Sequence, residues 1–201
     1  MRAVEQLGLP FSAPGLDQRV PPGPVAVRGL RDSQRLRLYR AEANLRGARL
    51  PVLDECRAFL GEVVADRWWR ERFPHLGLDD VPDFRPGRGA RRAFFRIELA
   101  PPHGTGRPSI TLPRRYRTQH VVLHEAAHWA LEGRADVAPH GPTFARLLLD
   151  LTERFRGARA AAKLAEHYDT QRVRVGPPPE AGDSGWWCYG PDRPAGRVAT
   201  A

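Results

Sequence analysis

The run His124-Glu125-Ala126-Ala127-His128 constrains this chain more than any other feature of its sequence. On a helix with 3.6 residues per turn, residues four positions apart lie on one face, so His124 and His128 can bind one metal ion together. Glu125 lies about 100° around the helix from His124, where its carboxylate can reach a water on that metal without binding the ion itself. The run therefore predicts a helix with two metal ligands and a candidate general base.

A catalytic zinc ion usually has three protein ligands and one open position, so a third ligand is needed beside the two histidines. His140 follows His128 by twelve positions, at the start of a His-Gly-Pro run, and is the preferred candidate. Glu153, 25 positions after His128, is an alternative, because a later helix can also supply a glutamate ligand. Glu153 equally suits the solvated face of an ordinary helix. We therefore expect one zinc ion held by His124, His128 and His140.

The residues around the motif are mostly apolar, which indicates a largely buried helix. They are Val121, Val122, Leu123, Ala126, Ala127, Trp129, Ala130 and Leu131. Burying two histidines and a glutamate is costly unless their polar atoms find partners, and a metal ion is such a partner. A pair of hydrogen-bonded core histidines is the simpler alternative, but it explains neither Glu125 nor the downstream His140.

Three further residues are candidates for assisting the chemistry. His120 lies one turn before His124 on the same helical face, where it can support a ligand or stabilise an oxyanion. Tyr116 and His103 are candidates for stabilising a transition state. Each of the three also has an ordinary interpretation as a surface residue.

The composition favours one globular domain with a basic surface. The chain has 201 residues, a formal net charge of +9 and 41% hydrophobic residues, enough for one well-cored domain. Lys163 is the only lysine, so arginine carries most of the positive charge. This usage is typical of a GC-rich coding sequence, but a basic surface also attracts nucleic acid and other polyanions. Two cysteines, Cys56 and Cys188, make neither a disulfide framework nor a four-cysteine zinc ribbon.

Nothing in the sequence indicates export or insertion into a membrane. The first 20 residues lack the apolar core of a signal peptide, and no stretch approaches the roughly 18 apolar residues of a membrane span. We therefore expect a cytoplasmic protein without a membrane partner. The sequence gives no indication of the oligomeric state.

The hydrophobic pattern predicts an α+β fold. Helices are expected over residues 32–46 and 51–72, strands over 93–99 and 109–112, the motif helix over 117–132, and two C-terminal helices over 142–155 and 158–168. Pro/Gly-rich composition predicts a flexible N-terminal tail over residues 1–27 and a C-terminal tail over 175–201. The order of N-terminal helices, a small mixed sheet, an HExxH helix and C-terminal helices is that of a zincin-like domain, here residues 28–174. The segment 110–112 is the expected edge strand, beside which an extended peptide can bind.

The active-site residues resemble a known family. The pairing of His124-Glu125-x-x-His128 with His140-Gly141-Pro142-x-Phe144 is similar to the SprT/Spartan-like zinc metallopeptidases. In these proteins the histidine of the His-Gly-x-x-Phe element is the third zinc ligand, which implies that role for His140. Many SprT-like proteins also carry a zinc ribbon after the catalytic domain, and this chain has no cysteines for one. The resemblance therefore does not by itself imply proteolysis on DNA, and it leaves open whether DNA regulates the activity.

A second resemblance begins near the N-terminus. The run Arg31-Asp32-Ser33-Gln34-Arg35, with Tyr39 and Glu42 downstream, is similar to the start of a family of HExxH zinc metallohydrolases from high-GC bacteria. Together with the motif helix, this resemblance covers about residues 28–174. It implies hydrolysis as the reaction class without naming a substrate.

These observations predict a zinc metallopeptidase. Zinc lowers the pKa of a bound water and polarises a carbonyl, and Glu125 takes the proton of the water and passes it to the leaving amine of a protein or peptide substrate. The sequence does not distinguish a regulatory protease that cleaves a single partner from a general protease. The alternative is a non-catalytic protein of the same fold that holds nucleic acid or another polyanion.

Two further segments bear on that alternative. The arginines between residues 31 and 46 can contact phosphates, although such a face is more often solvated and paired with Asp32 and Glu42. Trp186, Trp187 and Tyr189 either pack the C-terminal segment onto the domain or stack on bases.

Overall fold

The computed structural model describes residues 32–45, 47–87, 92–100, 104–179, 189–190 and 192. The expected N-terminal tail over residues 1–27 lies outside the described residues, as do His103, Trp186, Trp187 and Cys188.

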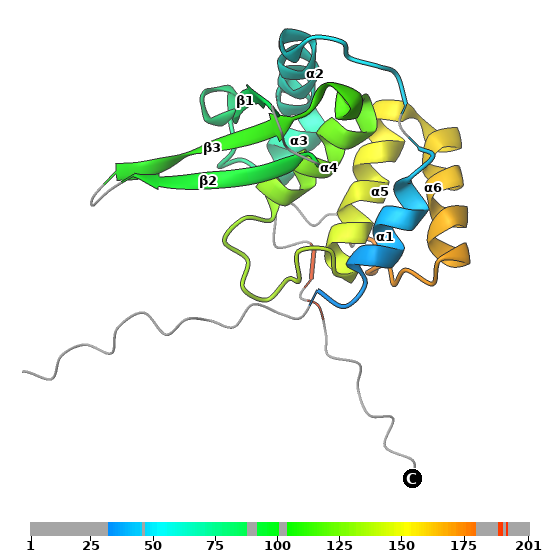
Figure 1. The fold of residues 1–201 in the computed structure, drawn as a ribbon. Helices are drawn as coiled ribbons and strands as arrows, with labels where there is room; N and C mark the ends of the chain where they lie inside the picture. Colours follow the sequence, from blue (N-terminus) through cyan, green and yellow to red (C-terminus); the bar gives the residue numbers. More distant parts are fainter. Residues whose placement is uncertain are drawn as a thin grey trace, which may run out of the picture.

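The described chain has an α+β fold, which confirms the predicted class (Figure 1). In chain order its elements are α1 (Arg35–Glu42), α2 (Leu53–Ala65), α3 (Arg67–Arg72), η1 (Leu78–Asp80), β1 (Asp83–Pro86), β2 (Phe94–Ala100), β3 (Gly104–Leu112), η2 (Arg114–Tyr116), α4 (Gln119–Ala130), α5 (Pro142–Arg156) and α6 (Ala158–Thr170). The η elements are short 3-10 helices.

Capping residues set the ends of several helices. The Thr118 side chain accepts a hydrogen bond from the Val121 N–H and begins the motif helix α4. Pro142 occupies the first turn of α5, where its missing N–H costs nothing. The single helix expected over residues 51–72 is wrong, because Asp66 has an extended ψ of 141° and separates α2 from α3. The Asp66 carboxylate accepts from the Trp68 N–H and thereby starts α3.

The sheet has three strands in the order β1-β3-β2. β1 pairs with β3 in parallel, with Phe84 opposite Ile110, and β2 pairs with β3 in antiparallel, with Phe95 opposite Ile110. The prediction that residues 110–112 form an edge strand is therefore wrong, since they lie in the central strand. The error arose because β1 has only four residues, ends in a proline and pairs with a strand far away in the sequence. The strand at the edge opposite β1 is β2.

The motif helix α4 lies at the centre of the domain. It packs against α2, α5 and β2, while α6 packs against α5 and α1. Figure 1 shows the sheet on one side of α4 and the α1, α5 and α6 helices on the other. Val122, Leu123, Ala126 and Ala127 on α4 are fully buried. This central position explains why the predicted helix is apolar on nearly all sides.

Part of the expected C-terminal tail packs onto the domain. Tyr189 is 1% exposed, its ring stacks on Phe73, and its hydroxyl donates to Asp150 at 2.9 Å. The Thr143 hydroxyl donates to the Gly190 carbonyl at 2.7 Å. Packing onto the domain is thus the observed role of Tyr189.

The described helices include none with the length and apolar character needed to cross a membrane.

We predict that Asp66→Ala destabilises the fold by about 1 kcal/mol, because it removes the cap of α3. Asp66 also pairs with Arg154 at 2.9 Å, and Arg154 together with the Trp68 N–H holds the pKa of Asp66 below its ordinary value of 3.8. Its contribution to stability is therefore present above about pH 4 and is lost as the pH falls through the lowered pKa.

Urea unfolding of Asp66→Ala and Arg154→Ala at pH 7 and at pH 3 tests this prediction. Arg154→Ala removes only the surface ion pair, and we expect it to cost less than Asp66→Ala at pH 7. Equal losses for the two variants would show that the cap contributes nothing.

Candidate metal centre

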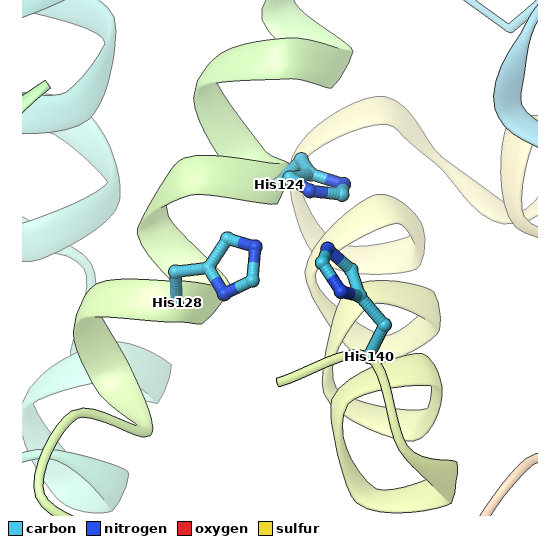
Figure 2. Close-up of side chains that lie close together, drawn as sticks. All are labelled: His124, His128 and His140. Atoms are coloured by element: carbon cyan, nitrogen blue, oxygen red, sulfur yellow. The ribbon is translucent and has the colours of Figure 1, made fainter. Parts of the chain in front are cut away.

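Three histidines converge on one point in the structure (Figure 2). His124 and His128 extend from successive turns of α4, and His140 reaches them from the loop between α4 and α5. One ligand nitrogen from each ring lies within 4.8 Å of those of the other two. The ring centroids are 4.8 to 5.5 Å apart. The predicted triad can therefore hold a metal ion.

Phe144 packs beneath the three imidazoles. It lies on the first turn of α5, and its ring centroid is 5.0 Å from that of His124, 4.6 Å from His128 and 5.2 Å from His140. His124 and His140 are 6% and 5% exposed, and His128 is partly buried. An aromatic ring that contacts all three imidazoles restricts their side-chain rotation and keeps them close together.

The loop that carries His140 is fixed by residues close to the histidine. The Asp192 carboxylate accepts hydrogen bonds from the Ala138 N–H at 2.8 Å and the Thr143 N–H at 2.9 Å. A Cβ atom at position 141 would lie 1.8 Å from Oδ2 of Asp192, so only glycine fits there. The glycine of the His-Gly-Pro run thus leaves room for the carboxylate that holds the loop.

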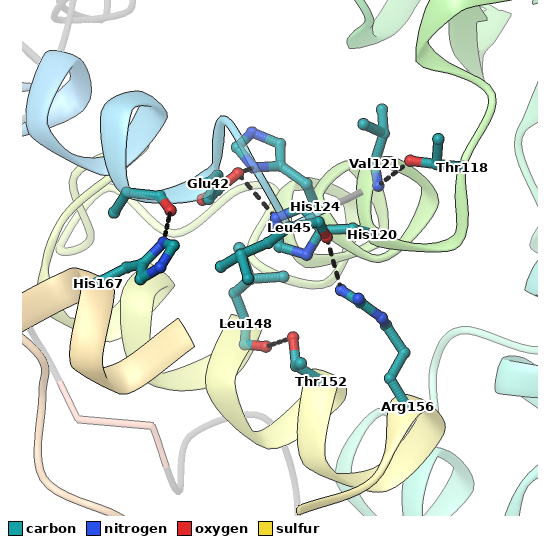
Figure 3. Close-up of polar contacts among 11 residues, drawn as sticks. Glu42, Leu45, Thr118, His120, Val121, His124, Leu148, Thr152, Arg156 and His167 are labelled. Atoms are coloured by element: carbon teal, nitrogen blue, oxygen red, sulfur yellow. Dashed lines mark hydrogen bonds and ion pairs between the residues drawn. The ribbon is translucent and has the colours of Figure 1, made fainter. Parts of the chain in front are cut away.

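Glu42, the last residue of α1, connects two histidines of α4 (Figure 3). Its Oε2 lies 2.9 Å from Nδ1 of His124 and 3.2 Å from Nε2 of His120. The carboxylate side chain is 9% exposed. Because Nδ1 of His124 donates to Glu42, Nε2 of the same ring is the nitrogen left to bind a metal.

Asp32, just before α1, contacts Nδ1 of His140 in the way that Glu42 contacts Nδ1 of His124. Its Oδ2 lies 2.8 Å from Nδ1 of His140. Nε2 of His140 is buried and has no hydrogen-bond partner in the described part of the chain. A buried ring nitrogen without a partner is costly, and a metal ion at the triad would satisfy it. The donors present therefore fit a metal whose ligand imidazoles are oriented by carboxylates.

The charges in the site favour neutral ligand rings on two of the three histidines. Burial lowers the pKa of His128, and the neighbouring charges of His124 and His140 lower it further. Burial likewise lowers the pKa of His140, although Asp32 opposes this. Neutral imidazole is the form that binds metal ions. Burial disfavours charge on His124 as well, but Glu42 outweighs it and raises the pKa of that ring.

Glu125 lies beside the triad on the same helix. It is 3% exposed, and its Oε2 has no hydrogen-bond partner among the described residues. Burial raises its pKa to about 7, while His124 and a hydrogen bond from the Phe95 N–H of β2 counteract the rise. Glu125 and His124 also line a cavity of about 320 Å³. Glu125 and one of the three ligand histidines thus border an accessible space.

The other predicted site residues lie in different surroundings. His120 is buried and contacts Glu42, so it supports His124 through a shared carboxylate and is not an ordinary surface residue. Tyr116 lines the cavity beside Glu125. Glu153 is exposed on α5 and does not belong to the cluster, so the alternative ligand set is wrong.

The sequence interpretation missed the role of three residues around α1. It treated Asp32 and Glu42 only as partners of nearby arginines. Asp32 does pair with Arg35 at 3.9 Å, but both carboxylates also contact ligand histidines. Tyr39 lies 5.0 Å from His140 and 5.9 Å from His124 between ring centroids. Tyr39 and Glu42 are three positions apart and share a helix face, which was an available signal for a joint role.

Comparisons of the chain with models of protein families, with curated proteins and with solved structures find no match. Three imidazoles can hold one metal ion, two carboxylates orient two of those imidazoles, and Glu125 is a buried carboxylic acid beside an accessible cavity.

We predict that Gly141→Ala reduces the affinity for zinc, because the added methyl group displaces Asp192 from the two N–H groups that it holds. Gly61→Ala in α2 is the matched control, since a Cβ there has no neighbour within 4 Å, and alanine stabilises a helix by about 0.5–1 kcal/mol. Thermal unfolding with and without zinc measures both effects. A zinc-dependent shift of the melting temperature that is equal in Gly141→Ala and wild type would contradict the prediction.

We also predict that Glu42→Gln and Asp32→Asn each lower the affinity for zinc by about 10–100-fold, since carboxylates behind ligand imidazoles raise their basicity and fix their orientation. Competition with a fluorescent zinc chelator measures the dissociation constants. Glu71→Gln, which affects only a surface ion pair with Arg67, serves as the control. Unchanged affinity in both carboxylate variants, with folding intact by circular dichroism, would refute this role.

Proposed function

We propose that this chain is a zinc-dependent peptidase. The observation that carries the proposal is the position of Glu125, a buried carboxylate with one unpartnered oxygen, next to a histidine triad and facing a cavity. A site that only stabilises the fold has no need of such a carboxylate. Zinc is the proposed ion because three imidazole ligands with one open position are typical of catalytic zinc.

Glu125 is proposed as the general base and acid. When bound, zinc would supply a Lewis acid that polarises the substrate carbonyl and makes water more acidic. The Glu125 carboxylate accepts a proton as water attacks the carbonyl carbon, and then gives that proton to the leaving amine as the C–N bond breaks. A pKa of about 7 suits a group that must both accept and return a proton near neutral pH.

The free edge of β2 is the proposed binding place for an extended peptide. Ile97 lies opposite Pro108, which has no N–H to share with it, and the Phe95 N–H points to Glu125 instead of to β3. Alternate backbone groups of β2 therefore face away from β3, on the side of Glu125. A peptide that adds to this edge would pass beside Glu125.

The zincin-like fold and the SprT-like resemblance are part of the same proposal. A helix with HExxH beneath a sheet edge, followed by a His-Gly-Pro-x-Phe element whose histidine joins the triad, supports them. A polyanion-binding protein of the same fold is the competing idea. It gives no role to Glu125.

We expect zinc-loaded wild-type protein to cleave peptides, and Glu125→Gln to lose about 10²–10⁴-fold in kcat/KM while keeping one equivalent of zinc. Turnover of a quenched fluorescent peptide library, together with metal analysis by mass spectrometry, provides the two measurements. Glu132→Gln, just after the same helix, should cleave normally, and His140→Ala should lose both zinc and activity. Stoichiometric zinc in the wild type with no cleavage of any library member would favour the binding protein.

A further inference from the structure

The two oxygens of the Glu42 carboxylate have different surroundings. Oε2 lies 2.9 Å from Nδ1 of His124 and 3.2 Å from Nε2 of His120. Oε1 is buried and has no hydrogen-bond partner among the described residues. A buried carboxylate oxygen without a donor is costly, because it has lost its bound water and gained no other partner. The contacts with the two histidines therefore leave Glu42 one donor short.

Tyr168 on α6 carries a group that matches this oxygen. Its side chain is fully buried, and its hydroxyl makes no hydrogen bond of ordinary geometry within the described part of the chain. Burial raises the pKa of Tyr168, and the neighbouring Glu42 raises it further through its charge and as an acceptor for the hydroxyl. A phenol donates one hydrogen bond and a carboxylate oxygen accepts one, so each group supplies what the other lacks.

The packing of α6 against α1 brings the two groups together. Nδ1 of His167 donates to the carbonyl of Ala41 at 2.8 Å (Figure 3). Two consecutive residues of α6, His167 and Tyr168, thus meet two consecutive residues of α1, Ala41 and Glu42. The bond to the backbone fixes one helix against the other beside the carboxylate.

A hydroxyl at position 168 is not explained by packing alone. Phenylalanine would fill the same buried space and would avoid the cost of burying a polar group. The hydroxyl of Tyr168 therefore needs a role that compensates for this cost, and the free oxygen of Glu42 provides one.

We propose that Tyr168 is a positioning residue of the metal centre, whose hydroxyl donates to Oε1 of Glu42. A hydrogen bond to a charged carboxylate is stronger than one between neutral groups. It holds the carboxylate with Oε2 toward Nδ1 of His124, which directs Nε2 of that ring to the ion. The inference rests on metal binding by the triad and does not depend on the proposed peptidase function.

The zinc affinity of Tyr168→Phe in the full chain tests this role. We expect the affinity to fall by about 3–10-fold, less than in Glu42→Gln, because the ring and the ligands remain and one hydrogen bond is lost. Competition with a fluorescent zinc chelator measures the affinity, and urea unfolding of the metal-free protein measures the stability of the fold separately.

Thr152→Val is the matched control. The Thr152 hydroxyl is fully buried and donates to the Leu148 carbonyl at 2.7 Å within α5, so its removal costs a buried hydrogen bond without affecting Glu42. We expect this variant to lose stability and to bind zinc as the wild type does.

The same Tyr168→Phe change in a Glu42→Ala background separates positioning from packing. If Tyr168 acts through Glu42, its hydroxyl has no effect on zinc affinity there, whereas a packing role would lower the affinity by the same factor in both backgrounds. Glu42→Gln is a second background, in which the loss should be smaller than in the wild type, since a neutral amide oxygen is a weaker acceptor than a carboxylate.

Three outcomes would overturn the positioning role: equal zinc affinity in Tyr168→Phe and wild type, an equal loss in all backgrounds, or a Tyr168→Phe chain that no longer folds. The last would show that the hydroxyl holds the fold itself. A weakened zinc site in Tyr168→Phe, with no peptide cleavage by the wild type, would support the positioning role and count against the peptidase. Cleavage by the wild type with unchanged affinity in the variant would do the reverse.

Discussion

The contacts of the Glu42 carboxylate with two histidines of α4, a hydrogen bond from His124 and a close polar contact with His120, are the interactions on which the arrangement of the site depends. Burial disfavours a charged carboxylate, yet the two histidines outweigh this cost and hold the pKa of Glu42 well below its ordinary value. A buried carboxylate without such partners would destabilise the fold. The same contact that makes burial tolerable therefore fixes α1 against α4 and orients His124.

Other polar side chains hold further segments around the centre by hydrogen bonds. Asp32 orients His140, and Gln34 holds the chain before α1 through paired hydrogen bonds with the backbone of Arg174. Asp192 holds the loop that carries His140. Segments from both ends of the described chain thus meet around α4. Metal binding and folding should consequently be coupled, since the ligand positions depend on contacts between distant parts of the chain.

The site joins a desolvated group to a more accessible surface. Glu125 is buried, which suits proton transfer, whereas Arg92 and Arg115, which line the adjoining cavity, are exposed. Tyr39 connects the two, because its ring contacts those of His124 and His140 and also the guanidinium group of Arg92.

Local periodicity was enough to predict the α+β class, the motif helix with His124, Glu125 and His128, and the addition of His140, because helix geometry and a short loop keep these residues near one another. Contacts between segments far apart in the sequence could not be predicted from local periodicity. The sequence could not show that β1 pairs with β3 and leaves β2 at the edge, or that Asp32 and Glu42 contact ligand histidines. A carboxylate in an amphipathic helix has the same local pattern whether it meets solvent or a buried imidazole. Only the folded chain decides this, because it brings Glu42 to the histidines of α4 and Asp32 to His140, and because desolvation and partner distance are properties of the tertiary structure.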